Sequence, residues 1–223
     1  MNQHSQTVTR SNESILATNK VLRNTYSLLS MTLVFSAVMA GISMVMELPR
    51  GVGMFSSIGA IVLLWFVIPR TANSASGILW VFVMTGLLGL GLGPMLNAYL
   101  QLPNGSELIM TALGGTGVIF LGLSGYALTT RKDFSFMGGF LMAGIMVIFI
   151  AGIGAAIFDL SGLALAVSAG FILLMSGLIL YETSNIIHGG ETNYIMATVS
   201  LYVSIYNLFT SLLHLLGAMG NDD

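Results

Sequence analysis

The chain has 223 residues, of which 55% are hydrophobic and only 7% are charged. A soluble domain carries roughly 25% charged residues, so a surface this poor in charge must face lipid or other helices. The formal net charge is −2, and no basic tract indicates a nucleic-acid partner. The absence of cysteine excludes disulfides and thiolate metal sites, and nothing in the composition points to a cofactor.

Seven apolar stretches are long enough to cross a bilayer, which requires ~20 mostly apolar residues. Gly, Pro, Asn and charged residues separate them, as expected for turns. The predicted spans are residues 25–46, 53–68, 77–100, 107–129, 136–158, 163–187 and 194–216. The predicted fold is therefore all-α, a polytopic membrane bundle of seven transmembrane helices. It occupies residues 25–216, between a polar tail (1–24) and a short carboxy-terminal tail (217–223).

The basic residues predict how the bundle is oriented. Cytoplasmic loops of membrane proteins carry the excess of Lys and Arg. With seven spans, Arg50 stands alone on one side of the membrane. The other side collects Arg10, Lys20, Arg23, Arg70, Arg131 and Lys132. We therefore expect the amino terminus in the cytoplasm and the acidic carboxy terminus on the outer side.

Small residues predict where two helices approach closely. Gly89 and Gly93 lie four residues apart and form a small-xxx-small pair in the third span. Such pairs let a neighbouring backbone come near, which matters because lipid gives apolar helices little reason to associate.

The last span carries a polar stripe. Ser200, Ser204, Asn207, Ser211 and His214 recur at intervals of four, three, four and three, which places them on one helix face. Lipid does not accept such a stripe, so it should face the bundle interior or a water-filled cavity. We expect this helix to be central. Its stripe serves either as hydrogen-bonding glue between helices or as part of a polar path.

Glu182 is a carboxylate inside the membrane. It precedes the turn at His188 by six residues and should lie ~9 Å below that turn, at 1.5 Å per residue. Asn185 shares its helix face at i+3, and Tyr181 adjoins it. An ionised carboxylate at this depth costs several kcal/mol unless it is paired, so Glu182 should be protonated or hold a cation.

The short turn makes the last two spans antiparallel neighbours, which brings Ser200 and Ser204 to a depth comparable with that of Glu182. Two interpretations of Glu182 stand side by side. It is either a group that senses protons or cations beside a polar path, or a structural carboxyl. As a structural carboxyl it would be bonded to Asn, Ser or Tyr, or paired with Arg70.

A protease interpretation fails on geometry. Residues 122–125 (Gly-Leu-Ser-Gly) resemble the nucleophile motif of rhomboid intramembrane proteases, and residues 214–217 faintly resemble their histidine motif. Catalysis needs Ser and His within hydrogen-bond reach. The topology places Ser124 near the cytoplasmic face and His214 near the other, with ~20 Å of depth between them.

Four segments resemble the Bax-inhibitor (transmembrane Bax inhibitor motif) family: residues 22–26, 128–133, 182–194 and 200–209. The resemblance covers nearly the whole chain. It implies a seven-helix fold with a central last helix and, for the bacterial branch, a location in the inner membrane. It further implies a modulator of FtsH, the ATP- and zinc-dependent membrane protease. Such a modulator acts as a poor substrate that occupies the enzyme, and the tail (1–24) is the handle. The alternative for that segment is a plain solvated tail.

Other members of the family are pH-sensitive calcium leak channels, whose sensor is a pair of aspartates on the last two helices. Here the first position corresponds to Glu182 and the second to Ser204. Two carboxylates in contact share a proton, which a lone Glu facing Ser cannot do. The resemblance therefore argues against a di-acid gate, whereas a single protonatable Glu still fits a path for calcium or protons. The predicted ion-sensing residues are Glu182, Ser204, Asn185, Asn207 and Arg70.

Overall fold

The computed structural model describes the backbone of residues 3–220 and the side chains of residues 16–220, and every regular element in this range is helical. A π-helical segment, η1 (Leu63–Val67), joins α2 to α3, and a 3-10 turn, η2 (Ser135–Met137), precedes α6. The helices are α1 (Gln3–Val45), α2 (Arg50–Val62), α3 (Ile68–Thr71), α4 (Ser76–Leu100), α5 (Gly105–Thr130), α6 (Gly138–Ile157), α7 (Ser161–Ile187) and α8 (Tyr194–Met219).

Seven helical segments in the described range are long and apolar enough to cross a membrane. The elements α2, η1 and α3 together form the second of them, residues 50–71, and η2 with α6 forms the fifth. The predicted all-α fold with seven spans is therefore confirmed, and six of the predicted spans begin and end within three residues of the observed spans. The first span begins earlier than predicted.

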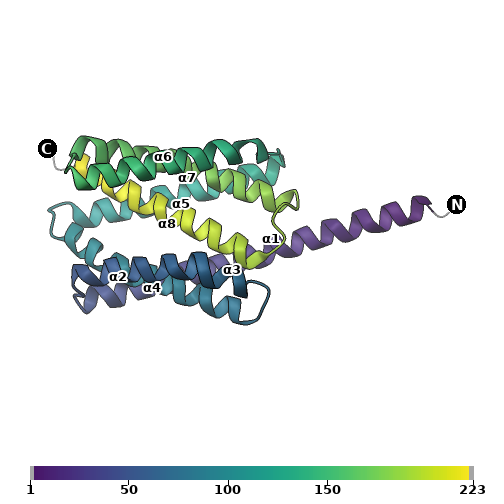
Figure 1. The fold of residues 1–223 in the computed structure, drawn as a ribbon, viewed down its shortest axis with the longest axis horizontal. Helices are drawn as coiled ribbons and strands as arrows, with labels where there is room; N and C mark the ends of the chain where they lie inside the picture. The colour runs from purple at the N-terminus through teal and green to yellow at the C-terminus, as the bar shows by residue number, and fades with distance from the viewer. Residues whose placement is uncertain (1–2, 221–223) are drawn as a thin grey trace.

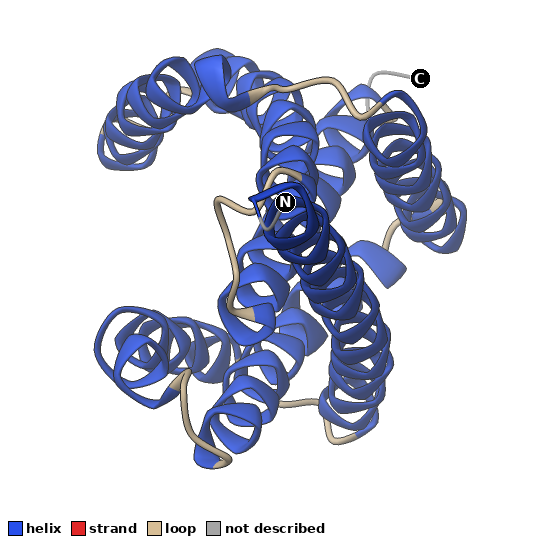
Figure 2. Ribbon diagram, turned by 90° about the vertical axis from the view of Figure 1, so that its right-hand side faces the viewer, coloured by secondary structure: helices blue, strands red, loops and turns tan. Residues whose placement is uncertain are grey.

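The helix α8 lies at the centre of the bundle. Figure 1 shows it running diagonally between a layer that contains α6 and α7 and a layer that contains α2 and α4. It packs against α7, α5 and α1. Figure 2 shows the same bundle viewed along its long axis, with every regular element helical. Half of its most apolar stretch (50%) is buried, the largest share of any span. The central position predicted from the polar stripe is confirmed.

The two glycines of the predicted close contact bring α1 against α4. A Cβ at Gly89 would meet the backbone oxygen of Ser36, and one at Gly93 would meet the side chain of Ser43. The Ser43 hydroxyl donates to the carbonyl of Leu90 at 2.7 Å. Glycine permits this approach, and the approach lets side chains of α1 bond the backbone of α4.

The amino-terminal helix extends beyond the bundle. Figure 1 shows α1 projecting past the other helices, with the two ends of the chain at opposite ends of the long axis. The helix is continuous from Gln3 to Val45, so no break in secondary structure marks residue 24. The boundary between tail and membrane domain stays a prediction.

Candidate functional site

Glu182 lies between α7 and α8 and accepts hydrogen bonds from two serines. The hydroxyl of Ser200 donates to Glu182 Oε1 at 2.6 Å, and that of Ser204 lies 3.2 Å from Oε1 and 3.1 Å from Oε2. Glu182 as a whole is 9% exposed and Ser204 is 1% exposed. The expected common depth of these three residues is therefore observed, because the turn at residues 188–193 folds α8 directly back along α7.

Asn193 fixes the start of α8. Its side-chain oxygen accepts from the backbone N–H groups of Ile195 and Met196 at 2.9 and 3.2 Å, which caps the helix. Its amide nitrogen donates to the carbonyl of Ala72 at 3.0 Å and to Asn73 Oδ1 at 2.8 Å. This residue ties the first turn of α8 to the turn before α4, and thereby sets the height of Ser200 and Ser204 relative to Glu182.

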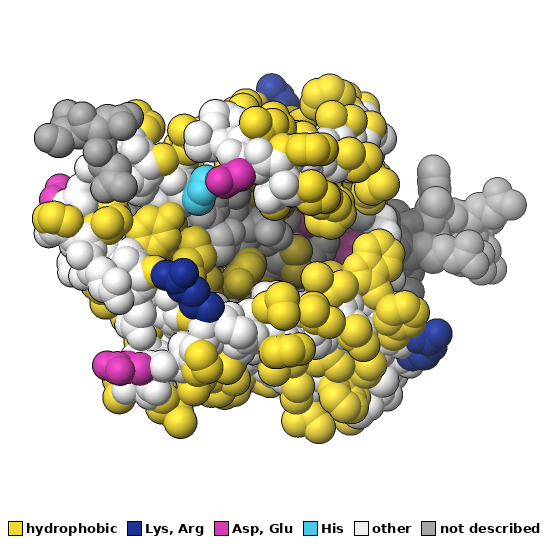
Figure 3. Space-filling model, turned by 60° about the vertical axis from the view of Figure 1, so that its left-hand side comes forward, with side chains coloured by type: hydrophobic (Ala, Val, Ile, Leu, Met, Phe, Trp, Pro, Cys, Tyr) yellow, Lys and Arg dark blue, Asp and Glu magenta, His cyan; other side chains and the backbone are white. Residues whose placement is uncertain are grey.

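A cleft of about 300 Å³ opens beside the carboxyl group. Its walls come from η1, α6, α7 and α8, and besides Glu182 they include Tyr181, Asn185, Glu191 and Leu64. Figure 3 shows a hollow between an upper and a lower group of helices, with acidic side-chain atoms inside it. The π-helical turn η1 faces this cleft through Leu64, and such turns within α-helices often occur near functional sites.

The structure brings only some of the predicted ion-sensing residues together. Asn185 lines the same cleft as Glu182 and Ser204. Asn207 donates to the carbonyl of Val203, on its own helix, at 2.9 Å. Arg70 donates to the carbonyl of Phe66, and within residues 16–220 no ion pair joins it to Glu182. The alternative in which Arg70 neutralises Glu182 is therefore not supported by the geometry, since the arginine is held by its own helix at the end of the span.

The residues of the polar stripe of α8 lie in different environments. Ser204 and Ser211 are buried, whereas Ser200 and His214 lie at the edge of the bundle. His214 is held by α7, with its Nδ1 2.9 Å from the Ser168 hydroxyl. The stripe therefore follows α7 over much of its length and does not form one continuous interior path.

The two residues of the protease interpretation have separate partners. Ser124 lies near the end of α5, and its hydroxyl is 3.4 Å from that of Thr183. His214 lies near the other end of the bundle, beside Ser168. Both contacts agree with the expectation that these two side chains do not meet.

A second polar cluster was not foreseen from the sequence. The Tyr202 hydroxyl, on the opposite side of α8 from Glu182, donates to Ser36 Oγ at 2.5 Å and lies 3.4 Å from the carbonyl of Thr85. Tyr202 is only 1% exposed. Its position two residues from Ser204 places it off the stripe, and a buried tyrosine usually finds a partner for its hydroxyl. That rule indicates a bond but not its partner.

The geometry limits the chemistry of the Glu182 site. Within the described residues, no group of three or more His, Asp or Glu side chains is placed to hold a metal ion. One carboxyl group with two hydroxyl donors can bind or release a proton, or contribute one ligand to a passing cation. The fold and this site define a polytopic helical membrane protein with one buried carboxyl group at the contact of its last two helices.

The family model described as "Inhibitor of apoptosis-promoting Bax1" matches residues 18–221, and the chain belongs to this Bax-inhibitor family. It is 54% identical over 209 residues, 94% of both chains, to an Escherichia coli protein named "Modulator of FtsH protease YccA". It is 50% identical over the full length of both chains to an uncharacterised membrane protein of Vibrio cholerae. An uncharacterised protein of Pseudomonas aeruginosa is 53% identical over 203 residues, 91% of both chains. The resemblance to YccA-like members of the family is thereby confirmed.

Proposed function

We propose that this protein is an inner-membrane modulator of the FtsH protease, a non-enzymatic partner that inhibits by protein–protein interaction. The observation that carries the proposal is the 54% identity, over 94% of both chains, to the E. coli protein named as a modulator of FtsH.

The amino-terminal part of α1 supplies a handle for the protease. It projects from the bundle (Figure 1), where an enzyme that pulls on chain ends can reach it. The bundle behind it is held by close helix contacts such as those at Gly89 and Gly93. A handle joined to a domain that resists unfolding makes a poor substrate, and such a substrate occupies the enzyme.

The test is copurification with FtsH and the rate at which FtsH degrades a second membrane substrate. We expect the intact chain to copurify and to slow that degradation. Deletion of residues 1–15 should abolish the slowing, while an unchanged melting temperature shows that the bundle still folds. Copurification with unchanged inhibition by the deletion variant would remove the handle from the mechanism. Absence of copurification would remove the proposal itself.

We also propose that the amino terminus faces the cytoplasm. Arg70, Arg131 and Lys132 lie at or next to span ends that share one end of the bundle with the amino terminus, which supports this orientation. Because the chain has no cysteine, single cysteines can report it without background. In intact cells, an impermeant maleimide should label Arg50→Cys and leave Lys20→Cys and Lys132→Cys unlabelled. The reverse pattern would invert the topology.

A second candidate function is a leak of calcium ions or protons, and the buried Glu182 carboxyl beside an open cleft favours it. The expected test is flux through reconstituted protein. Glu182→Gln keeps the shape of the side chain and removes the titration, so the flux of the variant should differ from that of the natural chain. Equal flux in both, or no flux, removes Glu182 from any such mechanism.

A further inference from the structure

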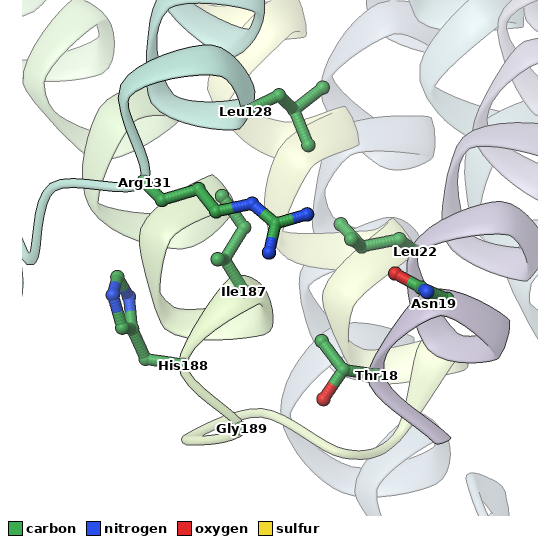
Figure 4. Close-up of a pocket in the computed structure, with 8 residues that line it drawn as sticks. All are labelled: Thr18, Asn19, Leu22, Leu128, Arg131, Ile187, His188 and Gly189. Atoms are coloured by element: carbon green, nitrogen blue, oxygen red, sulfur yellow. The ribbon is translucent and has the colours of Figure 1, made fainter. Parts of the chain in front are cut away.

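A polar pocket lies at the end of the bundle from which α1 projects. Its volume is about 270 Å³, and three segments that are far apart in sequence line it. Thr18, Asn19 and Leu22 come from α1, Leu128 and Arg131 from the end of α5, and Ile187, His188 and Gly189 from the end of α7. Figure 4 shows the Arg131 guanidinium reaching across the pocket toward Asn19, between Leu128 and Leu22.

The backbone of Arg131 is in an unusual conformation. It ends α5 in the left-handed region at φ 49° and ψ 29°. Glycine adopts this conformation at the end of a helix without strain, whereas a residue with a Cβ does so at a cost. The conformation directs the arginine away from the helix axis and over the pocket, as Figure 4 shows.

The Arg131 guanidinium has room for a ligand. No hydrogen bond or ion pair within residues 16–220 engages it, and no acidic side chain lines the pocket. The nearest acid in the sequence, Asp133, accepts a hydrogen bond from the backbone N–H of Ser135 at 2.8 Å. This bond lowers the pKa of Asp133, and the nearby His188, which lines the pocket, lowers it by a smaller amount. The neighbouring Lys132 is engaged elsewhere, 3.4 Å from the Tyr126 hydroxyl.

The pocket lies at the ends of two candidate membrane spans, the position at which a bundle meets lipid headgroups. Arg131 and His188 each directly follow the last residue of a membrane span, Thr130 and Ile187. Polar donors line its outer part, and the side chains of Leu22, Leu128 and Ile187 are apolar. Basic pockets between transmembrane helices at the cytoplasmic side are typical binding places for anionic headgroups.

We propose that this pocket binds the phosphate group of an anionic phospholipid. The Arg131 guanidinium binds the phosphate oxygens, and Asn19 and Thr18 donate hydrogen bonds from α1. The acyl chains extend along the apolar side chains of the pocket. Arginine suits this role because its planar fork matches phosphate oxygens with two parallel N–H donors. The bound lipid would fix the projecting part of α1 to the ends of α5 and α7.

The experiment uses the full chain in nonionic detergent, titrated with phosphatidylglycerol or with phosphatidylcholine and followed by native mass spectrometry. We expect retained phosphatidylglycerol in the natural chain. Arg131→Gln should weaken that retention at least about fivefold, the effect of one charge near a lipid surface. Lys132→Gln is the matched control, since it removes the same charge from the next residue but leaves the pocket unchanged. Equal losses in the two variants would overturn the proposal.

Two further measurements keep the result interpretable. Arg131→Gly relieves the left-handed backbone, so the variant should melt at the same or a higher temperature in plain detergent, yet lose the stabilisation that phosphatidylglycerol gives the natural chain. Lipid stabilisation that survives in Arg131→Gly would overturn the assignment of Arg131. The second measurement replaces phosphatidylglycerol with inorganic phosphate. If it protects the chain as well as phosphatidylglycerol does, the ligand is free phosphate and the lipid assignment is wrong.

Discussion

The two sides of α8 hold polar groups of different kinds. On the side of α7, the ionisable Glu182 carboxyl lies in a cleft of about 300 Å³ and its bonding partner Ser200 is exposed. On the side of α1 and α4, Tyr202 is 1% exposed and bonds Ser36. The cavity of about 500 Å³ beside Tyr202 is lined mostly by apolar side chains, and Ser36, Thr116 and Tyr206 also line it.

The difference follows from charge. Neutral hydroxyls satisfy one another at a helix contact, where each bond to a neighbouring helix adds to stability. A carboxyl group that ionises needs several donors or access to water, so its stable position is at an opening. The bundle thus separates a hydrogen-bond cluster of neutral hydroxyls from a carboxyl group that lines a cleft.

The largest effect on the free energy of unfolding is expected at the close contact between α1 and α4, next to Tyr202. Gly89→Ala places a Cβ against the backbone oxygen of Ser36, the residue that bonds Tyr202. Forcing α1 away from α4 should cost about 2 kcal/mol of unfolding free energy. Gly114→Ala is the control, because nothing lies within 4 Å of its added Cβ. It should stabilise the helix by about 0.5 kcal/mol. Both values come from reversible unfolding in detergent, and equal effects would contradict the close contact.

A smaller effect is expected from the hydroxyl alone. Tyr202→Phe removes the donor to Ser36 and leaves that serine buried, which should cost about 1.5 kcal/mol. Tyr206 stacks on Tyr202 with ring centroids 6.4 Å apart, and its hydroxyl has no hydrogen bond within residues 16–220. Tyr206→Phe should therefore change the unfolding free energy by less than about 0.5 kcal/mol. Similar costs for the two tyrosines would show that the Tyr202 cluster does not hold α8 in place.

The smallest effects are expected at the Glu182 side. Ser204→Ala removes a buried donor and should cost about 1 kcal/mol. Ser200→Ala should cost less than about 0.5 kcal/mol, although its bond to Glu182 is shorter, because water replaces an exposed hydroxyl. The same unfolding assay compares them. A larger cost for Ser200→Ala would mean that the cleft is dry, and would weaken the case for proton exchange at Glu182.

The sequence determined the seven spans and predicted that Ser200 and Ser204 lie at a height comparable with that of Glu182. These features follow from local geometry: the length needed to cross lipid, the rise per residue of a helix, and a turn so short that α8 must pack beside α7. The close approach at Gly89 and Gly93 was also predictable, since only small residues permit it.

Only the tertiary structure decided which neighbour each polar face meets. The sequence placed Arg70 among possible partners of Glu182, yet its guanidinium bonds Phe66 on its own helix. It placed His214 on the same stripe as Ser204, yet His214 meets Ser168 at the edge of the bundle. It gave no partner for Tyr202, which Ser36 supplies from 166 positions away along the chain. Helical periodicity fixes the direction of a side chain about its own axis, whereas the rotation, tilt and order of seven packed helices fix what lies in that direction.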